Sequence, residues 1–373
     1  MSRSKRVRVK RKSRRAQRRR NYSFLALAGF ILLASLFILL RTKGMLPANE
    51  SADDWYELKK DNKVLVHLPA DDATHDYYTE WWYYNGHLEG EDGRKYSFHY
   101  TVFLLNAFAL HTVIHASFID HESGQRYSYQ SRTGGNLSMD AEQGFNFNLG
   151  DWLMKGSDGV DRVQGKTEDF SFNLDLTSQT APVFQGGTGL LDFGSAGTSY
   201  YYSRPRMAIE GYAGLNGDEQ SVSGSAWFDH QWGDFRTTRL GWEWFALQLE
   251  DGADIMLYRL HSSEGQPFLV SGTYTKDNVT LLLGPDDITS TPLRYWQSPV
   301  SGVKYPLSWS IEIPQQKVKI TLATNRNDSE FDARSTTYNL YWEGTVAITG
   351  SHKGRGFLEV SPLHNTDMSS TGQ

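Results

Sequence analysis

From Val64 onward, apolar and polar positions alternate over short segments that are separated by turn sequences. Examples of these turns are Glu89–Arg94 (E-G-E-D-G-R), Asp120–Gly124 and Leu215–Asp218. A period of two predicts half-buried strands, and clusters of Gly, Asp and Asn predict the turns between them. No long stretch with a helical period follows residue 60. The pattern therefore predicts an all-β body.

One aromatic hairpin sequence occurs twice in this body. Glu80–Glu89 reads E-W-W-Y-Y-N-G-H-L-E, and Gly241–Glu250 reads G-W-E-W-F-A-L-Q-L-E. Each copy is followed by an acidic-Gly turn, Asp92-Gly93 or Asp251-Gly252, and then by another predicted strand. Such internal similarity indicates two β units that are built alike, each of a size suited to one antiparallel barrel.

The two units are predicted to occupy residues 61–235 and 236–365. Their closing segments also look alike, and we expect Ser223–Trp232 in the first unit to correspond to Glu343–His352 in the second. Residues 366–373 follow as a tail that we expect to be disordered.

The N-terminal part has a different composition. Residues 1–20 hold 12 Lys or Arg and no acidic residue, and residues 22–40 carry no charge. An apolar run of this length is about enough to cross a bilayer core of ~30 Å, and the basic flank marks the cytoplasmic side. We therefore expect a basic cytoplasmic tail (1–20), a single-pass signal-anchor helix in the inner membrane (21–41), a linker (42–60) and a periplasmic body. A cleaved signal peptide stays open as the alternative.

Composition and missing motifs narrow the function classes. The 373 residues contain no Cys, which excludes a disulfide framework, a thiolate metal site and a Cys nucleophile. All 43 Asp and Glu lie after the basic tail, so a nucleic-acid-binding body is not expected. The sequence has no G-x-S-x-G, P-loop or H-E-x-x-H motif. His111 and His115 share a strand face but have no third ligand nearby, and we predict neither a metal nor a cofactor.

The segment Gly224–Glu250 has the densest candidate chemistry, because four Trp stand close to Asp229, His230 and Asp234. Large aromatic side chains around a few titratable groups are typical of a ligand pocket. In a strand, His230 and Trp232 share one face while Asp229 points to the other. A buried core histidine at 230 and a purely structural role for the Trp residues are the alternatives.

Glu80 is an unusual residue beside the aromatic positions of the first hairpin. Two interpretations stay open for this carboxylate. It is either a pocket acid or one partner of a buried salt bridge with Arg204 or Arg206.

Four segments in the same order resemble the AttH-like family, a lipocalin-like group that includes carotenoid 1,2-hydratase (hydroxyneurosporene synthase). They are E-W-W-Y from Glu80, Y-Y-Y-S-R-P-R-M at Tyr200–Met207, W-F-D-H-Q-W-G from Trp227, and Y-W-E-G-T-V-A-I-T-G with G-F-L-E-V within Tyr341–Val360. The resemblance covers residues 60–362 and implies two calycin-type antiparallel barrels in tandem. It also implies hydro-lyase chemistry on isoprenoid chains or prenyl groups in some members, while other members have no known activity.

The hydratase branch carries a His-x-Trp pair and, further on, a Tyr-x-Asp pair. His230 and Trp232 match the first pair, and Tyr258 matches the Tyr of the second. Leu260 stands where the acid is expected, so a proton donor would have to come from another strand. The candidates for this donor are Asp229, Asp254 and Glu80.

We therefore expect an exported, membrane-anchored AttH-like protein that binds a long apolar or isoprenoid-like ligand and adds water across a C=C bond. The expected catalytic residues are His230, Asp229 and Tyr258. The expected ligand-binding residues are Trp232, Trp244, Glu80, Trp82 and Tyr202. The alternative is a non-catalytic carrier of a lipophilic molecule, with an ABC-type transporter permease as the partner that the resemblance implies. A pure interaction module, the third hypothesis, predicts no cavity between the barrels.

Overall fold

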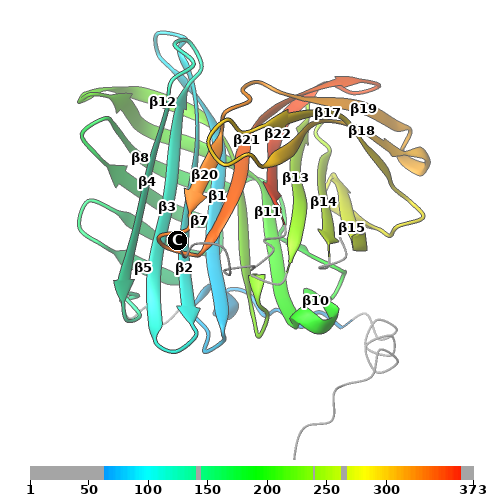
Figure 1. The fold of residues 1–373 in the computed structure, drawn as a ribbon, viewed down its shortest axis with the longest axis horizontal. Helices are drawn as coiled ribbons and strands as arrows, with labels where there is room; N and C mark the ends of the chain where they lie inside the picture. The colour runs from blue at the N-terminus through cyan, green and yellow to red at the C-terminus, as the bar shows by residue number, and fades with distance from the viewer. Residues whose placement is uncertain (1–62, 140–143, 238–239, 262–266, 363–373) are drawn as a thin grey trace, which may run out of the picture. The chain divides into compact units, whose positions relative to one another are not determined.

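The computed structural model describes residues 63–139, 144–237, 240–261 and 267–362, all within the compact unit Asn62–Gln373. Every regular element longer than three residues in these ranges is a β-strand (Figure 1). Within them, no helix is both long and apolar enough to cross a membrane. The expected basic tail, anchor helix, linker and C-terminal tail fall outside the described residues.

The strands form two antiparallel sheets, one after the other along the chain (Figure 1). The first sheet contains β1 (Thr79–Gly90), β2 (Lys95–Asn106), β3 (Leu110–Asp120), β4 (Arg126–Gly134), β5 (Phe145–Asn148), β6 (Leu153–Ser157), β7 (Val160–Lys166), β8 (Phe170–Ser178), β9 (Val183–Phe184), β10 (Leu190–Asp192), β11 (Thr198–Leu215) and β12 (Asp218–Gly233). The second sheet contains β13 (Gly241–Leu249), β14 (Asp254–His261), β15 (Pro267–Lys276), β16 (Val279–Leu283), β17 (Thr289–Gln297), β18 (Lys304–Ile313), β19 (Val318–Thr324), β20 (Glu330–Ala333), β21 (Asn339–Gly350) and β22 (Gly354–Ser361). The 3-10 helices η1 (Ala70–Asp72), η2 (Gly194–Ala196) and η4 (Pro314–Gln316) lie in connections between described strands.

Each sheet curls into a half-barrel, whereas the sequence led us to expect two antiparallel barrels. The strand orders are β4-β3-β2-β1-β12-β11-β8-β7-β6-β5 and β16-β15-β14-β13-β22-β21-β19-β18-β17, with β9 and β10 beside β11 and β20 beside β21. Among the described strands, β4 does not pair with β5, nor β16 with β17. The local sequence favours unpaired edge strands. β5 has only four residues. In β17, Pro292 has no backbone N–H to donate and lies beside a break in the register.

The predicted repeat is confirmed by equal places in the two sheets. β1 lies between β2 and β12, and β13 lies between β14 and β22. Both acidic-Gly turns form, with Gly93 at φ 82° and Gly252 at φ 87°, a conformation that residues without a Cβ adopt freely.

The expected match between the closing segments is wrong by one strand. Ser223–Trp232 lies in β12, whereas Glu343–His352 covers most of β21 and the turn after it. The strand that occupies the place of β12 in the second sheet is β22, because it is the one that pairs with β13.

Apolar side chains gather in three layers: inside the first sheet, inside the second sheet, and between the sheets. Members of these layers are Trp82 and Phe228 in the first, Phe245 and Trp309 in the second, and Tyr83, Trp227 and Trp244 in the third. Because side chains alternate along a strand, β1, β12 and β13 each supply both an inner layer and the layer between the sheets. This explains why their sequences are apolar and aromatic on both faces.

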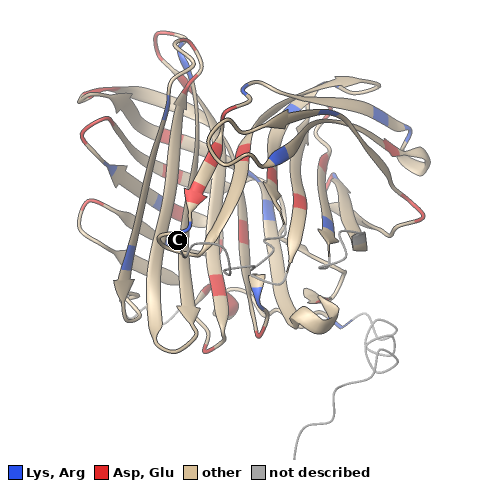
Figure 2. Cartoon of the chain, in the orientation of Figure 1, with Lys and Arg blue, Asp and Glu red and all other residues tan. Residues whose placement is uncertain are grey.

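Charged positions are spread over both sheets, and several acidic ones lie within strands rather than in loops (Figure 2). Buried carboxylates such as Asp229, Glu343 and Asp254 are at most 3% exposed. A buried acid requires hydrogen-bond partners or a proton, which makes these positions candidates for chemistry.

Candidate functional site

The two faces of β12 carry the expected site residues to two different places. His230 and Trp232 point into the first sheet, where Trp232 packs in the core and Trp82 stacks on His230. Asp229 points the other way and lines a cavity between the sheets. The period-two alternation expected for this strand is confirmed, and it places His230 and Asp229 on opposite faces of β12.

Three side chains inside the first sheet form what we call the His–Glu cluster: His75, Glu80 and His230. One carboxylate oxygen, Glu80 Oε1, lies 2.7 Å from His75 Nδ1 and 2.9 Å from His230 Nε2. The indole of Trp82 stacks on His230 at 4.4 Å between ring centroids, and that of Trp232 stacks on His75 at 4.2 Å. Glu80 and His230 are at most 1% exposed.

Electrostatics in the His–Glu cluster favour an ionised carboxylate and a neutral imidazole. Burial raises the pKa of Glu80, but hydrogen bonds from His230 and His75 outweigh it and leave the pKa below its ordinary value. Burial lowers the pKa of His230 despite its bond to Glu80. Of the two interpretations left open for Glu80, the salt bridge with Arg204 or Arg206 is not the one observed, because Arg204 pairs with Asp72 and Arg206 with Asp254.

Tyr202 belongs to the same buried region. Its hydroxyl donates to Asp72, and the Arg204 guanidinium lies 3.3 Å from the same carboxylate. The Tyr202 ring stands edge-on to His230, with ring centroids 5.5 Å apart. Five expected site residues therefore lie together, and all are at most 2% exposed: Glu80, Trp82, Tyr202, His230 and Trp232.

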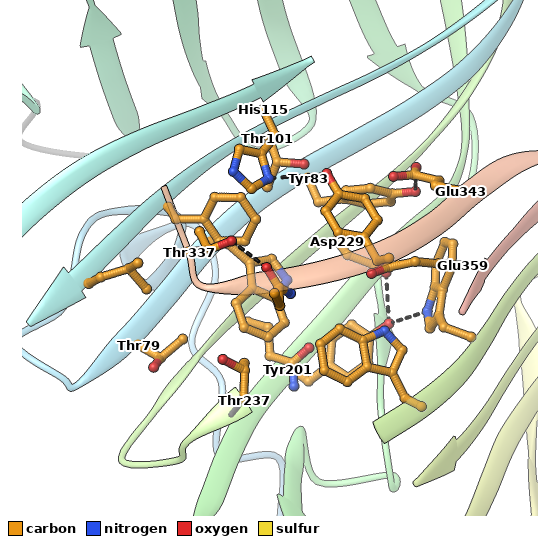
Figure 3. A pocket seen from close by; sticks show the side chains of 18 of the residues that line it. Thr79, Tyr83, Thr101, His115, Tyr201, Asp229, Thr237, Thr337, Glu343 and Glu359 are labelled. Carbon is orange, nitrogen blue, oxygen red and sulfur yellow. Dashed lines mark hydrogen bonds between the residues drawn. The ribbon is translucent and has the colours of Figure 1, made fainter. Parts of the chain in front are cut away.

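A cavity of about 90 Å³ lies between the two sheets (Figure 3). Its walls are mainly aromatic and hydroxylated, with three carboxyl groups. The lining residues are Thr79, Trp81, Tyr83, Thr101, Phe103, Leu105, His115, Tyr201, Asp229, Gln231, Thr237, Trp242, Trp244, Tyr258, Thr337, Asn339, Tyr341, Glu343 and Glu359. No Lys or Arg is among these lining residues, so the charge of the carboxyl groups is not neutralised within the cavity wall.

Asp229 is the most strongly hydrogen-bonded of the three cavity acids. Ser203 Oγ and Trp227 Nε1 donate to its Oδ1 at 2.5 and 2.8 Å, and Tyr201 Oη donates to Oδ2 at 2.7 Å. Trp244 Nε1 donates in turn to the Tyr201 oxygen at 2.9 Å. Burial raises the pKa of Asp229 to about 7, although the three donors lower it. Donors on both oxygens make Asp229 the group that holds negative charge most easily.

Glu359 and Glu343 face the cavity from β22 and β21. Burial raises the pKa of Glu359 to about 7, a bond from Trp242 lowers it, and the charge of Asp229 raises it again. Burial and the charge of Glu359 raise the pKa of Glu343 well above its ordinary value. Tyr83 Oη donates to Glu343 Oε1 at 2.5 Å. Near neutral pH, carboxyl groups of the cavity are therefore partly protonated. A protonated carboxyl group is the form that can transfer a proton to a substrate.

Tyr258 and Trp244, both expected site residues, lie beside this acid group. They are 5% and 4% exposed and line the cavity. Burial, with the charges of Glu359 and Asp229, raises the pKa of Tyr258, so its hydroxyl stays protonated and acts as a donor rather than a base.

Position 260 carries no acid, and the candidate donors from other strands lie in different places. Leu260 is fully buried opposite Trp242. Asp254, one expected substitute, is paired with Arg206 at 2.7 Å and does not line the cavity. Of the three candidate donors, only Asp229 lines the cavity. Sequence reasoning missed Glu343 and Glu359, although both lie in segments that carried the family resemblance.

The two histidines considered as metal ligands from the sequence have other partners. His111 Nδ1 lies 2.8 Å from the Ala109 carbonyl. His115 lies 2.8 Å from Thr336 Oγ1 and 3.1 Å from Tyr341 Oη, and burial lowers its pKa to about 3. His115 is therefore a neutral hydrogen-bonding residue at the cavity wall.

The fold and the cavity define a lipocalin-like all-β protein with two curled sheets and a buried acidic, aromatic site between them. Residues 59–362 match the AttH-like family, and the chain belongs to that family. The resemblance read from the four sequence segments is thereby confirmed.

Known proteins similar to this chain share most of its length. A solved structure assigned to AttH from Nitrosomonas europaea has a TM-score of 0.72 and 26% identity, covering 80% of this chain and 97% of its own. Kievitone hydratase from Nectria haematococca has a TM-score of 0.65 and 20% identity, covering 79% and 92%, which shows a shared fold. Dehydratase asqC of Emericella nidulans is 25% identical over 270 residues, 66% of this chain and 74% of that protein.

Proposed function

We propose that this protein adds water to, or removes it from, the apolar end of a lipophilic substrate held between its two sheets. The observation that carries the proposal is the pair Asp229 and Glu359, a buried and a part-buried carboxyl group with pKa values of about 7 in an aromatic cavity. Hydration of an alkene needs a proton donor, a site that tolerates positive charge, and an acceptor for the proton of water. The cavity offers all three.

The proton donor in this proposal is Glu359. It has one donor partner, Trp242, and the negative charge of Asp229 nearby favours its protonated form. Its proton would go to the less substituted alkene carbon, leaving a cation on the more substituted carbon. Trp244 and Tyr258 line the cavity and present aromatic surface that stabilises a cation.

The proton acceptor is Asp229. Water attacks the cation through its oxygen, one of its protons passes to the Asp229 carboxylate, and the product is an alcohol. Transfer of that proton back to Glu359 restores the starting state. Removal of water is the same sequence in reverse. His230 takes no part, because it lies on the opposite side of β12.

The cavity volume sets which part of a substrate reacts there. A space of about 90 Å³ is smaller than the ~150 Å³ cavity that holds benzene in an engineered protein. It suits the branched end of an isoprenoid chain and excludes a complete long chain. We therefore infer that the reacting end enters between the sheets and that the remainder lies outside this cavity.

The relatives support water chemistry of this type. One similar protein is named as a dehydratase and another as a hydratase. The basic residues 1–20 and the uncharged residues 22–40 support a membrane-anchored protein with a periplasmic body, for which a lipophilic substrate would be close at hand. An ABC-type permease remains the proposed partner on the family resemblance.

The test uses the full-length protein in detergent, incubated with geranylgeraniol or a prenylated phenol in ¹⁸O-labelled water. We expect a tertiary alcohol that contains ¹⁸O. Glu359→Gln should lower turnover by about 100-fold or more, while native mass spectrometry still shows the bound probe. The exposed Glu210→Gln is the matched control and should react like the wild type.

Two outcomes oppose the proposal. Unchanged turnover in Glu359→Gln removes this residue as the donor. Binding of the probes without conversion by the wild type rejects the enzyme and favours the non-catalytic carrier.

A further inference from the structure

The His–Glu cluster brings together ligand types that bind a transition metal. His75, Glu80 and His230 each offer one ligand atom, and these three atoms lie within 4.8 Å of one another. Two imidazole nitrogens and a carboxylate oxygen are a known ligand set for Zn²⁺, with a water molecule in the fourth position. From this convergence we propose that the cluster is a Zn²⁺ site, unrelated to the cavity between the sheets.

Three chain segments build the site. His75 comes from the connection between η1 and β1, Glu80 from β1 and His230 from β12. Trp82 faces His230 and Glu80 faces Trp232 across the β1–β12 pair, so Glu80 and His230 are diagonal neighbours on one face of the sheet. The backbone N–H of His75 donates to Glu80 Oε2 at 2.9 Å, which leaves Oε1 directed at the imidazoles.

Glu80 Oε1 lies closer to the two ring nitrogens than it would in an occupied Zn²⁺ site. Nitrogen and oxygen ligands about 2.0–2.2 Å from a tetrahedral Zn²⁺ lie roughly 3.4 Å apart. In the structure, Oε1 lies 2.7 and 2.9 Å from the two ring nitrogens. The two ring nitrogens must therefore move away from Oε1 by about 0.5–0.7 Å. The partly exposed His75 can provide its part of this shift from its connection.

The surroundings fit a metal site in two further ways. Asp71 Oδ1 lies 3.7 Å from His75 Nε2, the nitrogen that faces away from the cluster, and places a negative charge beside the imidazole. Trp82 and Trp232 stack on the two imidazoles and fix their planes.

Access and charge also favour a cation at this place. His75 is 18% exposed and Asp71 is 24% exposed, so solvent reaches the cluster from the loop side. The carboxylate of Glu80 offsets one charge of the ion, and Asp71 supplies a second negative group close by.

The experiment measures metal uptake by the full-length protein, purified in detergent with a tag that contains no histidine. After chelator treatment, the protein is titrated with Zn²⁺ and, separately, with Co²⁺ as a spectroscopic probe. We expect one equivalent of Zn²⁺ and the intense visible bands of tetrahedral Co²⁺. His75→Gln retains an N–H donor for Glu80 but is a poor ligand, and it should weaken binding by about 100-fold or more.

Two controls separate this proposal from the rest of the molecule. His352→Gln changes a part-exposed histidine of the second sheet and should bind like the wild type. Glu359→Gln changes the cavity between the sheets and should also leave uptake unchanged. If the wild type takes up no ion, or if His75→Gln binds as tightly, the cluster is a purely hydrogen-bonded core group and the proposal fails.

Discussion

Asp229 and Glu359 occupy the same position in the two sheets. Asp229 of β12 faces Tyr83 of β1, and Glu359 of β22 faces Trp244 of β13. Since Tyr83 and Trp244 are equivalent in the repeated hairpin, the two acids are equivalent as well. These equivalent positions thus supply one carboxyl group from each sheet, and Glu343 of β21 adds a third. Asp229 is 3% exposed, whereas Glu359 is part-buried, and the two also differ in their hydrogen-bond donors.

The first prediction concerns the pH dependence of the proposed reaction. Glu359 must be protonated to act, and its pKa is about 7. The kcat/KM for geranylgeraniol hydration should therefore fall about tenfold per pH unit above pH 7. A pH–rate profile between pH 5 and 9 measures it. Trp242→Phe removes a donor to the carboxylate, which should raise the pKa and move the fall to higher pH. A profile that stays flat contradicts the assignment.

The second prediction concerns stability against pH. Glu359 has a higher pKa in the folded protein than its ordinary 4.5, so the folded state holds the proton more tightly than the unfolded state. The free energy of unfolding should then decrease as the pH rises from 5 to 8. Glu359→Gln lacks this pH dependence. Between pH 5 and pH 8, its free energy of unfolding should therefore rise relative to that of the wild type by on the order of 3 kcal/mol. Urea unfolding at both pH values measures the difference, with Glu210→Gln as the control. If the free energies of unfolding of Glu359→Gln and the wild type depend on pH in the same way, the pKa of Glu359 is not raised in the folded protein.

The third prediction concerns Tyr201. Tyr201→Phe removes the hydroxyl that donates to Asp229 and leaves the buried Trp244 Nε1 without its acceptor. We expect a loss of about 1–3 kcal/mol in the free energy of unfolding. The pKa of Asp229 should rise, which the carboxyl band in infrared spectra reports. Tyr212→Phe, at a residue that is 57% exposed, should change stability by less than about 0.5 kcal/mol. Equal losses in both variants would refute the role of the buried network.

The fourth prediction concerns the ion pair that joins the sheets. Arg206 of β11 lies 2.7 Å from Asp254 of β14, which is 2% exposed, and burial raises the pKa of Asp254 to about 6 despite Arg206. Arg206→Ala should cost about 3 kcal/mol at pH 8, because it leaves a buried carboxylate unpaired. The loss should be smaller at pH 5, where Asp254 becomes neutral.

A matched control exists for this ion pair. Arg162 and Asp175 form an exposed pair, with side chains 41% and 64% exposed. Arg162→Ala should cost less than about 1 kcal/mol at either pH. If the two variants behave alike in denaturation experiments, the burial of Asp254 has no energetic consequence.

The strand pattern and the repeat could be predicted from the sequence because they depend on local signals. Alternation along Gly224–Trp232 separated His230 from Asp229, and the two copies of the aromatic hairpin marked β1 and β13. Closure of the sheets could not be predicted, because it depends on whether the two edge strands of a sheet, such as β4 and β5, pair with each other.

The chemistry of the site was predicted less well, for identifiable reasons. Glu359 was missed because the closing segment of the second unit was matched to β21 instead of β22. Pairing each closing strand with its aromatic hairpin would have placed Glu359 opposite Trp244, as Asp229 is opposite Tyr83. His75 was missed because it lies in a connection with no periodic pattern, and it meets His230 only through folding.

The layer between the sheets also limits how such a protein can be divided or recombined. Tyr83 and Trp227 from one half and Trp244 and Tyr258 from the other are covered only because the halves face each other. Expressed alone, either half would present this aromatic surface and its cavity acids to water, and would be prone to aggregate. Exchange of one half between relatives would succeed only where the facing aromatic surfaces fit, so the two halves of the gene are expected to evolve as one unit.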